Sequence, residues 1–154
     1  MVPQSELNIL KQFDTEGHLA LSLYLDLSTP KRRAGALERV LSALSASFPS
    51  GTGGNGSNGS DGHDPEELGG LQEDLELVRL YFRASGSCRS AYMAIFSCAP
   101  QLFWRVYHFD EPLQELLEIG HCLNVAPLEV ILSGRAADPA RGERSRLAAP
   151  LRIC

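Results

Sequence analysis

The chain has 154 residues, of which 44% are hydrophobic, and a formal net charge of −5. This length supports one domain with a buried core, which excludes a wholly disordered chain, and the negative charge argues against nucleic-acid binding over the whole surface. The charge is uneven: residues 51–130 carry 4 basic and 12 acidic side chains, whereas residues 131–154 carry 5 basic and 2 acidic ones. Nucleic-acid contact would therefore be confined to a local basic region.

Targeting and cofactor signals are missing from the sequence. Residues 1–10 lack a basic segment followed by an apolar stretch, and no apolar run approaches the roughly 20 residues of a membrane span. We therefore expect a cytoplasmic protein without membrane contact and without a cofactor. Free or buried thiols are expected at all four cysteines, because no zinc-ligand spacing is found among Cys88, Cys98, Cys122 and Cys154.

The first third of the chain predicts a helix, a strand and a second helix. Ser5 can cap the first helix, with Gly17 as its stop. Residues 18–27 place leucine at every odd position from 19 to 27, which predicts a strand with one strongly apolar face. Thr29-Pro30 is a helix start, and an apolar stripe at helical spacing then continues to Pro49.

The rest of the domain predicts a loop, a long helix and a β-hairpin. Residues 49–63 are rich in Gly, Ser and Asn and predict a flexible loop. Asp64-Pro65-Glu66-Glu67 starts a helix that should end at Gly86, and residues 91–98 and 102–109 read as two strands of a hairpin. Residues 111–132 show a weaker secondary-structure pattern and are expected to hold a short helix and one more strand.

These elements predict an α/β fold, in which a single mixed sheet is packed with helices. The domain is expected to span residues 1–132. Residues 133–154 are basic and without periodicity, so they are expected to be a disordered tail or the stump of a missing next domain.

Candidate catalytic residues are few. Asp26 at a strand end could be a catalytic acid, or simply a partner for the arginines that follow it. The aromatic residues of the hairpin could stack bases or fill the core. His108, His121 and Cys122 could converge on a metal, although their spacing indicates no site.

A basic cluster after the strand is the clearest candidate binding site. Lys31, Arg32 and Arg33 follow a helix start, and Arg39 lies two turns further on. Cations at the first turn of a helix face the positive end of its dipole. The cluster is therefore either a phosphate contact for a nucleic acid or a solvated charge run.

The segment LSLYLDLSTPKRRAGALERVLSAL (residues 21–44) resembles the opening of the N-terminal domain in bacterial relatives of archaeal and eukaryotic peptide-chain release factor 1 and Pelota. In that group a strand-to-helix segment of the form YLD-(T/L)-x-P-x-R recurs. Residues 74–113 are similar to the later part of the same domain, where a long helix precedes two strands. The likeness covers residues 5–128.

The resemblance implies a release-factor N-terminal-domain-like fold and a role on the ribosome in termination, rescue or hibernation. It implies ribosomal RNA as the partner of the cluster Lys31, Arg32, Arg33 and Arg39, and a translational GTPase as a further partner. The Gly-Gly-Gln motif of peptide release is absent, since Leu71 interrupts Gly69-Gly70-Leu71-Gln72, and no codon-reading Asn-Ile-Lys-Ser loop is present. No enzymatic activity is therefore expected.

Two further hypotheses are open. An acidic protein-interaction or regulatory domain without nucleic-acid binding would bind a basic partner on the face that bears the hairpin. A small hydrolase using Asp26 ranks last, because the sequence names no partner base or nucleophile.

Overall fold

The computed structural model describes residues 2–47, 65–84 and 90–136. Their elements are, in chain order, α1 (Gln4–Gln12), β1 (Ala20–Asp26), α2 (Pro30–Ala34), α3 (Ala36–Ser47), α4 (Pro65–Ala84), β2 (Tyr92–Cys98), the short 3₁₀ helix η1 (Ala99–Gln101), β3 (Phe103–Phe109), β4 (Leu116–Gly120) and α5 (Ala126–Ala136). The loop predicted at 49–63 and most of the tail predicted at 133–154 lie outside the described residues.

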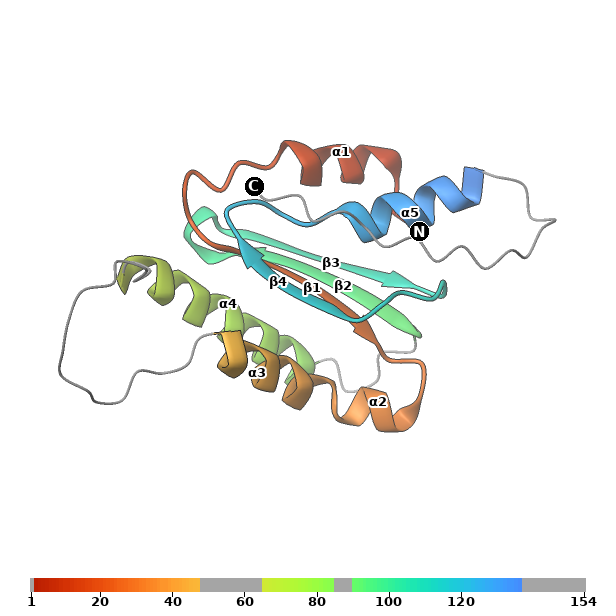
Figure 1. Cartoon of the computed structure of the whole chain (residues 1–154), viewed down its shortest axis with the longest axis horizontal. Coiled ribbons are helices and arrows are strands. Elements are labelled where there is room, and N and C mark those ends of the chain that lie inside the picture. Colours follow the sequence, from red (N-terminus) through yellow and green to blue (C-terminus); the bar gives the residue numbers. More distant parts are fainter. Residues whose placement is uncertain (1, 48–64, 85–89, 137–154) are drawn as a thin grey trace.

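The four strands form one sheet in the order β3-β2-β1-β4 (Figure 1). Helices α1 and α5 cover one face of the sheet, and α3 and α4 cover the other. The predicted α/β class with a single helix-packed sheet is thus confirmed. All three strand pairings are antiparallel, so the strand directions are not mixed as expected. Each strand therefore runs opposite to the strand or strands next to it, and β2 and β3 do so as a hairpin.

The expected strongly apolar face of β1 is present, and the opposite face of the strand is buried as well. Leu21, Leu23 and Leu25 pack against the α3/α4 layer. On the opposite face, Tyr24 is fully buried with residues from the α1/α5 layer. Its hydroxyl donates to the carbonyl of Asn124 at 2.6 Å, and the Ser22 hydroxyl accepts from the Asn124 N–H at 2.8 Å. Burial raises the pKa of Tyr24 far above its usual range.

The predicted helix from Thr29 to Pro49 is divided at Gly35. The Thr29 hydroxyl accepts from the Arg32 N–H at 3.2 Å, so the predicted cap is confirmed, but α2 has only five residues. Glycine is a poor helix former. The break at Gly35 gives α3 its own direction, which turns Ala36, Val40 and Leu44 into the leucine layer of β1.

The two ends of the described domain differ from expectation in their bounds. Helix α1 begins after Pro3, without a side-chain cap from Ser5, and ends at Gln12; Gly17 lies in a later turn at φ +84°. The strand and helix expected within residues 111–132 are both present as β4 and α5. Helix α5 continues to Ala136, beyond the domain end expected at residue 132. No helix among the described residues is long and apolar enough to cross a membrane.

Candidate functional site

The basic cluster lies at the corner between β1 and α3, and most of its cations are engaged within the chain. Arg32 forms an ion pair with Asp26 at 2.7 Å. The Arg33 guanidinium donates to the carbonyl of Leu27 at 3.1 Å, and its half-buried side chain leaves Nε without a partner among the described residues. Lys31 is exposed, and no ion pair of Lys31 is found within the described part of the chain.

Arg39 is a structural link. Its guanidinium makes bidentate contacts, at 2.6 to 3.2 Å, with the carboxylate of Glu115, the residue just before β4. It also donates to the carbonyl of Arg32 at 2.8 Å and to that of Asp26 at 3.3 Å. Arg39 therefore joins α3 to the end of β1 and to the β4 side of the sheet. A phosphate could reach it only by displacing these contacts.

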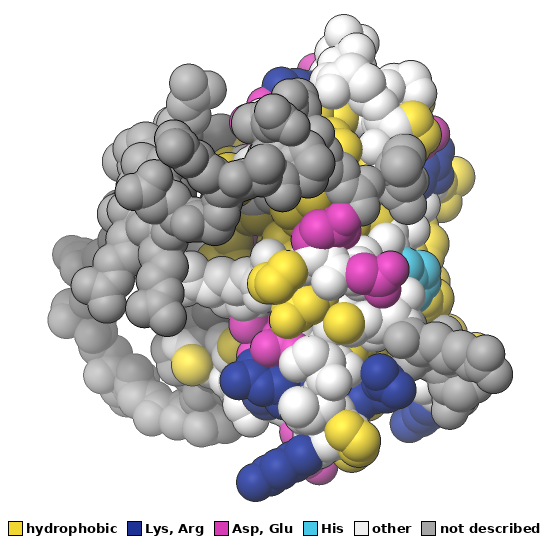
Figure 2. Space-filling view, turned by 90° about the vertical axis from the view of Figure 1, so that its right-hand side faces the viewer, with side chains coloured by type: hydrophobic (Ala, Val, Ile, Leu, Met, Phe, Trp, Pro, Cys, Tyr) yellow, Lys and Arg dark blue, Asp and Glu magenta, His cyan; other side chains and the backbone are white. Residues whose placement is uncertain are grey.

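The shortness of α2 removes the conflict between the cluster and the helix dipole. In a helix of five residues the first turn is also the last, so the cations lie as close to the carbonyl groups of its last turn as to the N–H groups of its first turn. Figure 2 shows Lys and Arg side chains over the lower part of this end of the molecule, which α2 occupies in Figure 1, with Asp and Glu side chains above and between them. The local electrostatics are mixed.

Asp26 serves the turn that follows β1. Its carboxylate accepts from the Ser28 hydroxyl and from the Ser28 N–H, the latter at 2.9 Å, and it pairs with Arg32. The hydrogen bonds from Ser28, followed by the nearby positive charges, hold the pKa of Asp26 below its usual value. These contacts favour the reading of Asp26 as a partner for the arginines.

The aromatic residues of the hairpin lie in packing positions. Phe96 and Phe109 are buried in the α1/α5-side core, and the rings of Phe103, Tyr107 and Trp104 pack against one or the other core. Among the described residues no group of His, Cys, Asp and Glu could hold a metal ion. Cys98 is a free buried thiol as expected, whereas Cys122 is disulfide-bonded, contrary to expectation.

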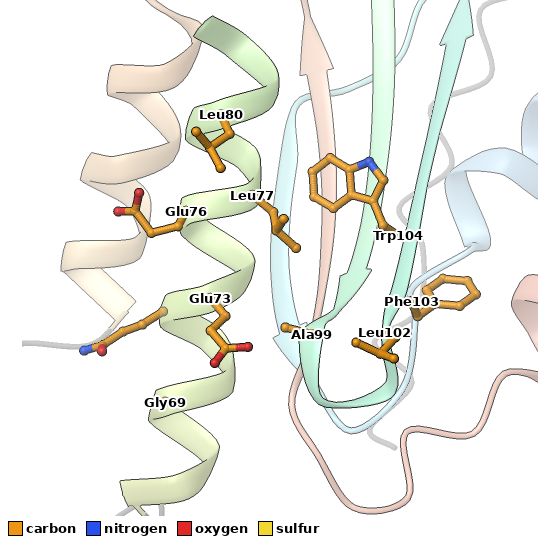
Figure 3. A pocket seen from close by; sticks show the side chains of 10 residues that line it. Gly69, Glu73, Glu76, Leu77, Leu80, Ala99, Leu102, Phe103 and Trp104 are labelled. Carbon is orange, nitrogen blue, oxygen red and sulfur yellow. The ribbon is translucent and has the colours of Figure 1, made fainter. Parts of the chain in front are cut away.

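A groove that the sequence did not reveal lies between α4 and the start of β3, with a volume of about 750 Å³. Helix α4 supplies one wall, and the hairpin supplies the other through Ala99, Leu102, Phe103 and Trp104 (Figure 3). The Leu77 side chain points across the groove toward Trp104. Two leucine side chains that line the groove are exposed to solvent, Leu77 by 38% and Leu80 by 55%.

Leu102 at the mouth of the groove is unusual in two respects. Its side chain is 95% exposed, and its backbone adopts the left-handed conformation at φ 51°, directly after η1. A turn residue in this conformation is more often Gly or Asn, because a larger L-residue costs about 1 to 2 kcal/mol there. An exposed leucine in a strained backbone conformation contributes little to the stability of the fold, so a role in binding at the surface would explain it better.

Acidic side chains border the apolar groove on α4. Glu73 and Glu76 line it and are exposed. Glu76 is paired with Arg79 on the same helix, whereas Glu73 has no ion pair among the residues that the structure describes. The groove thus offers an apolar surface next to a carboxylate that is open to a cation.

A buried carboxylate holds the wall of the groove in place. Asp74 is fully buried, and its Oδ1 accepts from the Ser97 hydroxyl and from the N–H of Ala99 at 2.9 Å. Its Oδ2 has no partner among the described residues. Burial raises the pKa of Asp74 to about 6, although both hydrogen bonds oppose the shift. Through these bonds Asp74 attaches α4 to the end of β2 and to η1.

The sequence carried a weak signal for this groove. Leu77 and Leu80 fall outside the stripe Leu71, Leu75, Val78 and Phe82 that the helical period assigns to the core. Such off-stripe leucines are common on protein surfaces, so they become informative only when the fold places them beside Leu102 and Trp104. No protein-family model and no curated protein matches the chain.

Proposed function

We propose that this chain is a non-enzymatic protein-interaction domain, and that the groove between α4 and β3 is its binding surface. The observation that carries the proposal is Leu102, an almost fully exposed leucine in a strained backbone conformation at the mouth of an apolar groove. Exposed apolar patches of this kind are typical of interaction sites. The partner would be a segment that combines apolar side chains with at least one cation facing Glu73.

The proposal is tested by comparing what the immobilised full chain and its variants retain from a cell extract. Leu102→Asn and Leu80→Gln should both lose the same retained protein, because each removes apolar area from the groove. Val130→Gln is the matched control, since Val130 is 72% exposed on α5, on the other side of the sheet. The retained protein is then purified and titrated against wild type, these three variants and Glu73→Gln.

The titration separates a groove partner from adventitious capture. We expect Leu102→Asn and Leu80→Gln to weaken the affinity of the purified partner by about tenfold each, with Val130→Gln unchanged. Glu73→Gln should weaken it less and should reduce its salt dependence. Equal binding by wild type and by both groove variants would overturn the proposal.

Association with ribosomes or RNA is the second candidate function. The observation that favours it is the exposed side chain of Lys31, next to the half-exposed Arg32, at the end of the molecule where basic side chains gather (Figure 2). The Arg32 side of the Arg32–Asp26 ion pair is open to solvent, so a phosphate could replace Asp26 as the partner of Arg32. On this proposal the contact would position an RNA without reading its sequence.

Co-sedimentation with ribosomes at low and high salt tests the second candidate. Lys31→Glu is the cleanest variant, because it alters no contact among the described residues, whereas changing Arg33 or Arg39 would also disturb the fold. Salt-sensitive association that falls with Lys31→Glu and stays with Leu102→Asn would support RNA contact. If no salt-sensitive association occurs, or if Lys31→Glu leaves it unchanged, this candidate is rejected.

A further inference from the structure

The surface of helix α4 changes the sign of its charge along the helix. Among the described side chains, the exposed acidic ones before Val78 are Glu73 and Glu76, and the cations after it are Arg79 and Arg83. Glu76 is paired with Arg79 in the same helix. No ion pair of Glu73 or Arg83 is found in the part of the chain that the structure describes. Each half of this surface therefore has one charge available to a partner.

Two leucines lie in the middle of this surface. Leu80 is 55% exposed and Leu77 is 38% exposed. Residues three or four apart are neighbours on a helix, so Glu73, Leu77 and Leu80 follow one another along α4 (Figure 3). Arg83 comes three residues after Leu80 and continues the same row. The α4 row, defined by these four residues, thus reads acid, leucine, leucine, cation.

We infer that the α4 row packs antiparallel against the α4 row of a second copy of this chain, about a two-fold axis near Val78. Leu77 of each copy then lies opposite Leu80 of the other, and the contact occurs twice by symmetry. The leucines lose contact with water in this arrangement, which favours association.

Charge complementarity selects the antiparallel orientation. It places Glu73 of each copy opposite Arg83 of the other, at both ends of the contact. It also brings Glu76 of each copy next to Arg79 of the other. In a parallel pair every residue would lie opposite its own equivalent, so like charges would meet at both ends, which is destabilising. Antiparallel packing also places the positive end of each helix dipole beside the negative end of the other.

This inference rests on the proposed function, because α4 is one wall of the groove, and it names the partner of that wall. The groove is complementary to a segment with apolar side chains and a cation that can face Glu73. The chain itself carries such a segment, since Leu80 is followed by Arg83 on the same row. Leu102 belongs to the other wall and takes no part in the contact between the two rows.

Sedimentation of the full chain over a wide concentration range tests the inference. Wild type should form a dimer. Leu80→Gln and Arg83→Glu should each weaken dimerisation at least about tenfold, the first by removing apolar contact and the second by placing carboxylates face to face at both ends. Two controls should leave the dimer unchanged: Val130→Gln on the other side of the sheet, and Lys31→Glu, which changes the net charge as Arg83→Glu does. Circular dichroism shows whether each variant is folded.

Mixing two charge variants gives the sharpest result. Arg83→Glu carries Glu at both ends of the row and Glu73→Arg carries Arg at both. At a concentration where neither dimerises alone, an equimolar mixture should therefore form a heterodimer. The double variant Glu73→Arg/Arg83→Glu should dimerise by itself, because the exchange keeps an acid opposite a cation. A wild type that stays monomeric at high concentration would overturn the inference, and so would folded variants that fail to associate on mixing.

Leu102→Asn separates this inference from the proposed function. It should leave the dimer intact and should lose the protein retained from a cell extract. A monomeric wild type whose retained protein is still lost with Leu102→Asn would reject the second copy as the partner and keep the groove as a binding surface. A dimer that persists in Leu102→Asn, with retention unchanged, would keep the pairing of the α4 rows and reject the groove proposal.

Discussion

The buried carboxylate of Asp74 is the residue whose ionisation should be visible in the stability of the whole chain. Its pKa in the folded state is raised to about 6 from an ordinary value of 3.8. The folded chain therefore keeps this proton at pH values where the unfolded chain has lost it. The contribution of Asp74 to the free energy of unfolding should fall as the pH rises from about 3.8 to about 6, by no more than about 3 kcal/mol.

Asp74→Asn should remove this pH dependence. Its amide oxygen can still accept from Ser97 and Ala99, and the amide does not ionise. Urea unfolding of both chains from pH 4 to pH 7 gives a difference curve in which the variant gains relative to wild type as the pH rises. Asp74→Ala should lose about 2 to 4 kcal/mol at pH 4, because two buried donors lose their acceptor, and this deficit should shrink as the pH rises and the wild type itself loses stability. A flat difference curve for Asp74→Asn would contradict the raised pKa.

Leu102 is predicted to trade stability against binding. Leu102→Gly relieves the left-handed conformation and removes an exposed side chain, so the melting temperature should stay equal or rise, with a gain of at most about 1 kcal/mol. Thermal unfolding followed by circular dichroism measures this. A loss of more than about 1 kcal/mol would show that the side chain supports the fold, and the argument for its role in binding would then be lost.

At the scale of elements, helix α4 lies close to the turn of the hairpin at Gly70. A Cβ atom at this position would lie 2.7 Å from Cγ of Pro100, whereas one at Gly69 would meet nothing within 4 Å. The two neighbouring glycines therefore form a matched pair on the same helix. Gly70 sets the distance between the walls of the groove, while Gly69 simply lowers the stability of the helix.

Opposite effects of alanine are expected at these two positions. Gly69→Ala should stabilise the chain by up to about 1 kcal/mol through helix propensity. Gly70→Ala should destabilise it by about 1 to 3 kcal/mol, because the clash with Pro100 outweighs the same gain. Chemical denaturation measures both. If Gly70→Ala were as stabilising as Gly69→Ala, α4 would have to move away from the hairpin without cost.

Arg39 is a candidate binding residue that the packing of helices and strands turns into a structural one. From the sequence it belonged with Lys31, Arg32 and Arg33 as a phosphate contact. The fold brings Glu115 beside it from 76 positions away, and the resulting bidentate pair is partly buried. The Arg39 guanidinium is therefore engaged in linking α3 to the β4 side of the sheet. The exposed cations of the cluster are Lys31 and Arg32.

At the scale of the whole molecule, β1 is shared by both cores. Leu23 faces the α3/α4 layer and Tyr24 faces the α1/α5 layer, and both are fully buried. Neither layer can therefore lose its packing while β1 stays protected on both faces. The described domain should unfold in one cooperative step.

Two variants on opposite faces of β1 test this cooperativity. Leu23→Ala should cost about 2 to 5 kcal/mol through the cavity it leaves, and Tyr24→Phe about 1 to 2 kcal/mol through the lost bond to Asn124. Fluorescence of Trp104, the one tryptophan, reports on the α3/α4 side, and far-ultraviolet circular dichroism reports on all helices. Both probes should shift together in both variants. Separate transitions would show that the two layers unfold independently.

The sequence by itself determined the α/β class of the fold and most of its elements. Leucine alternation in β1, Thr29-Pro30 at the start of α2 and the hairpin around Pro100 depend on local geometry, which neighbouring residues specify. Only the tertiary structure decided that the second face of β1 is buried, because the sequence around Tyr24 does not show that α1 and α5 cover this side chain. It also decided the candidate sites: Arg39 bonds to Glu115, and Leu102 lies across a groove from α4, only because the fold brings together residues far apart in the chain. Such contacts follow from packing, and no local pattern encodes them.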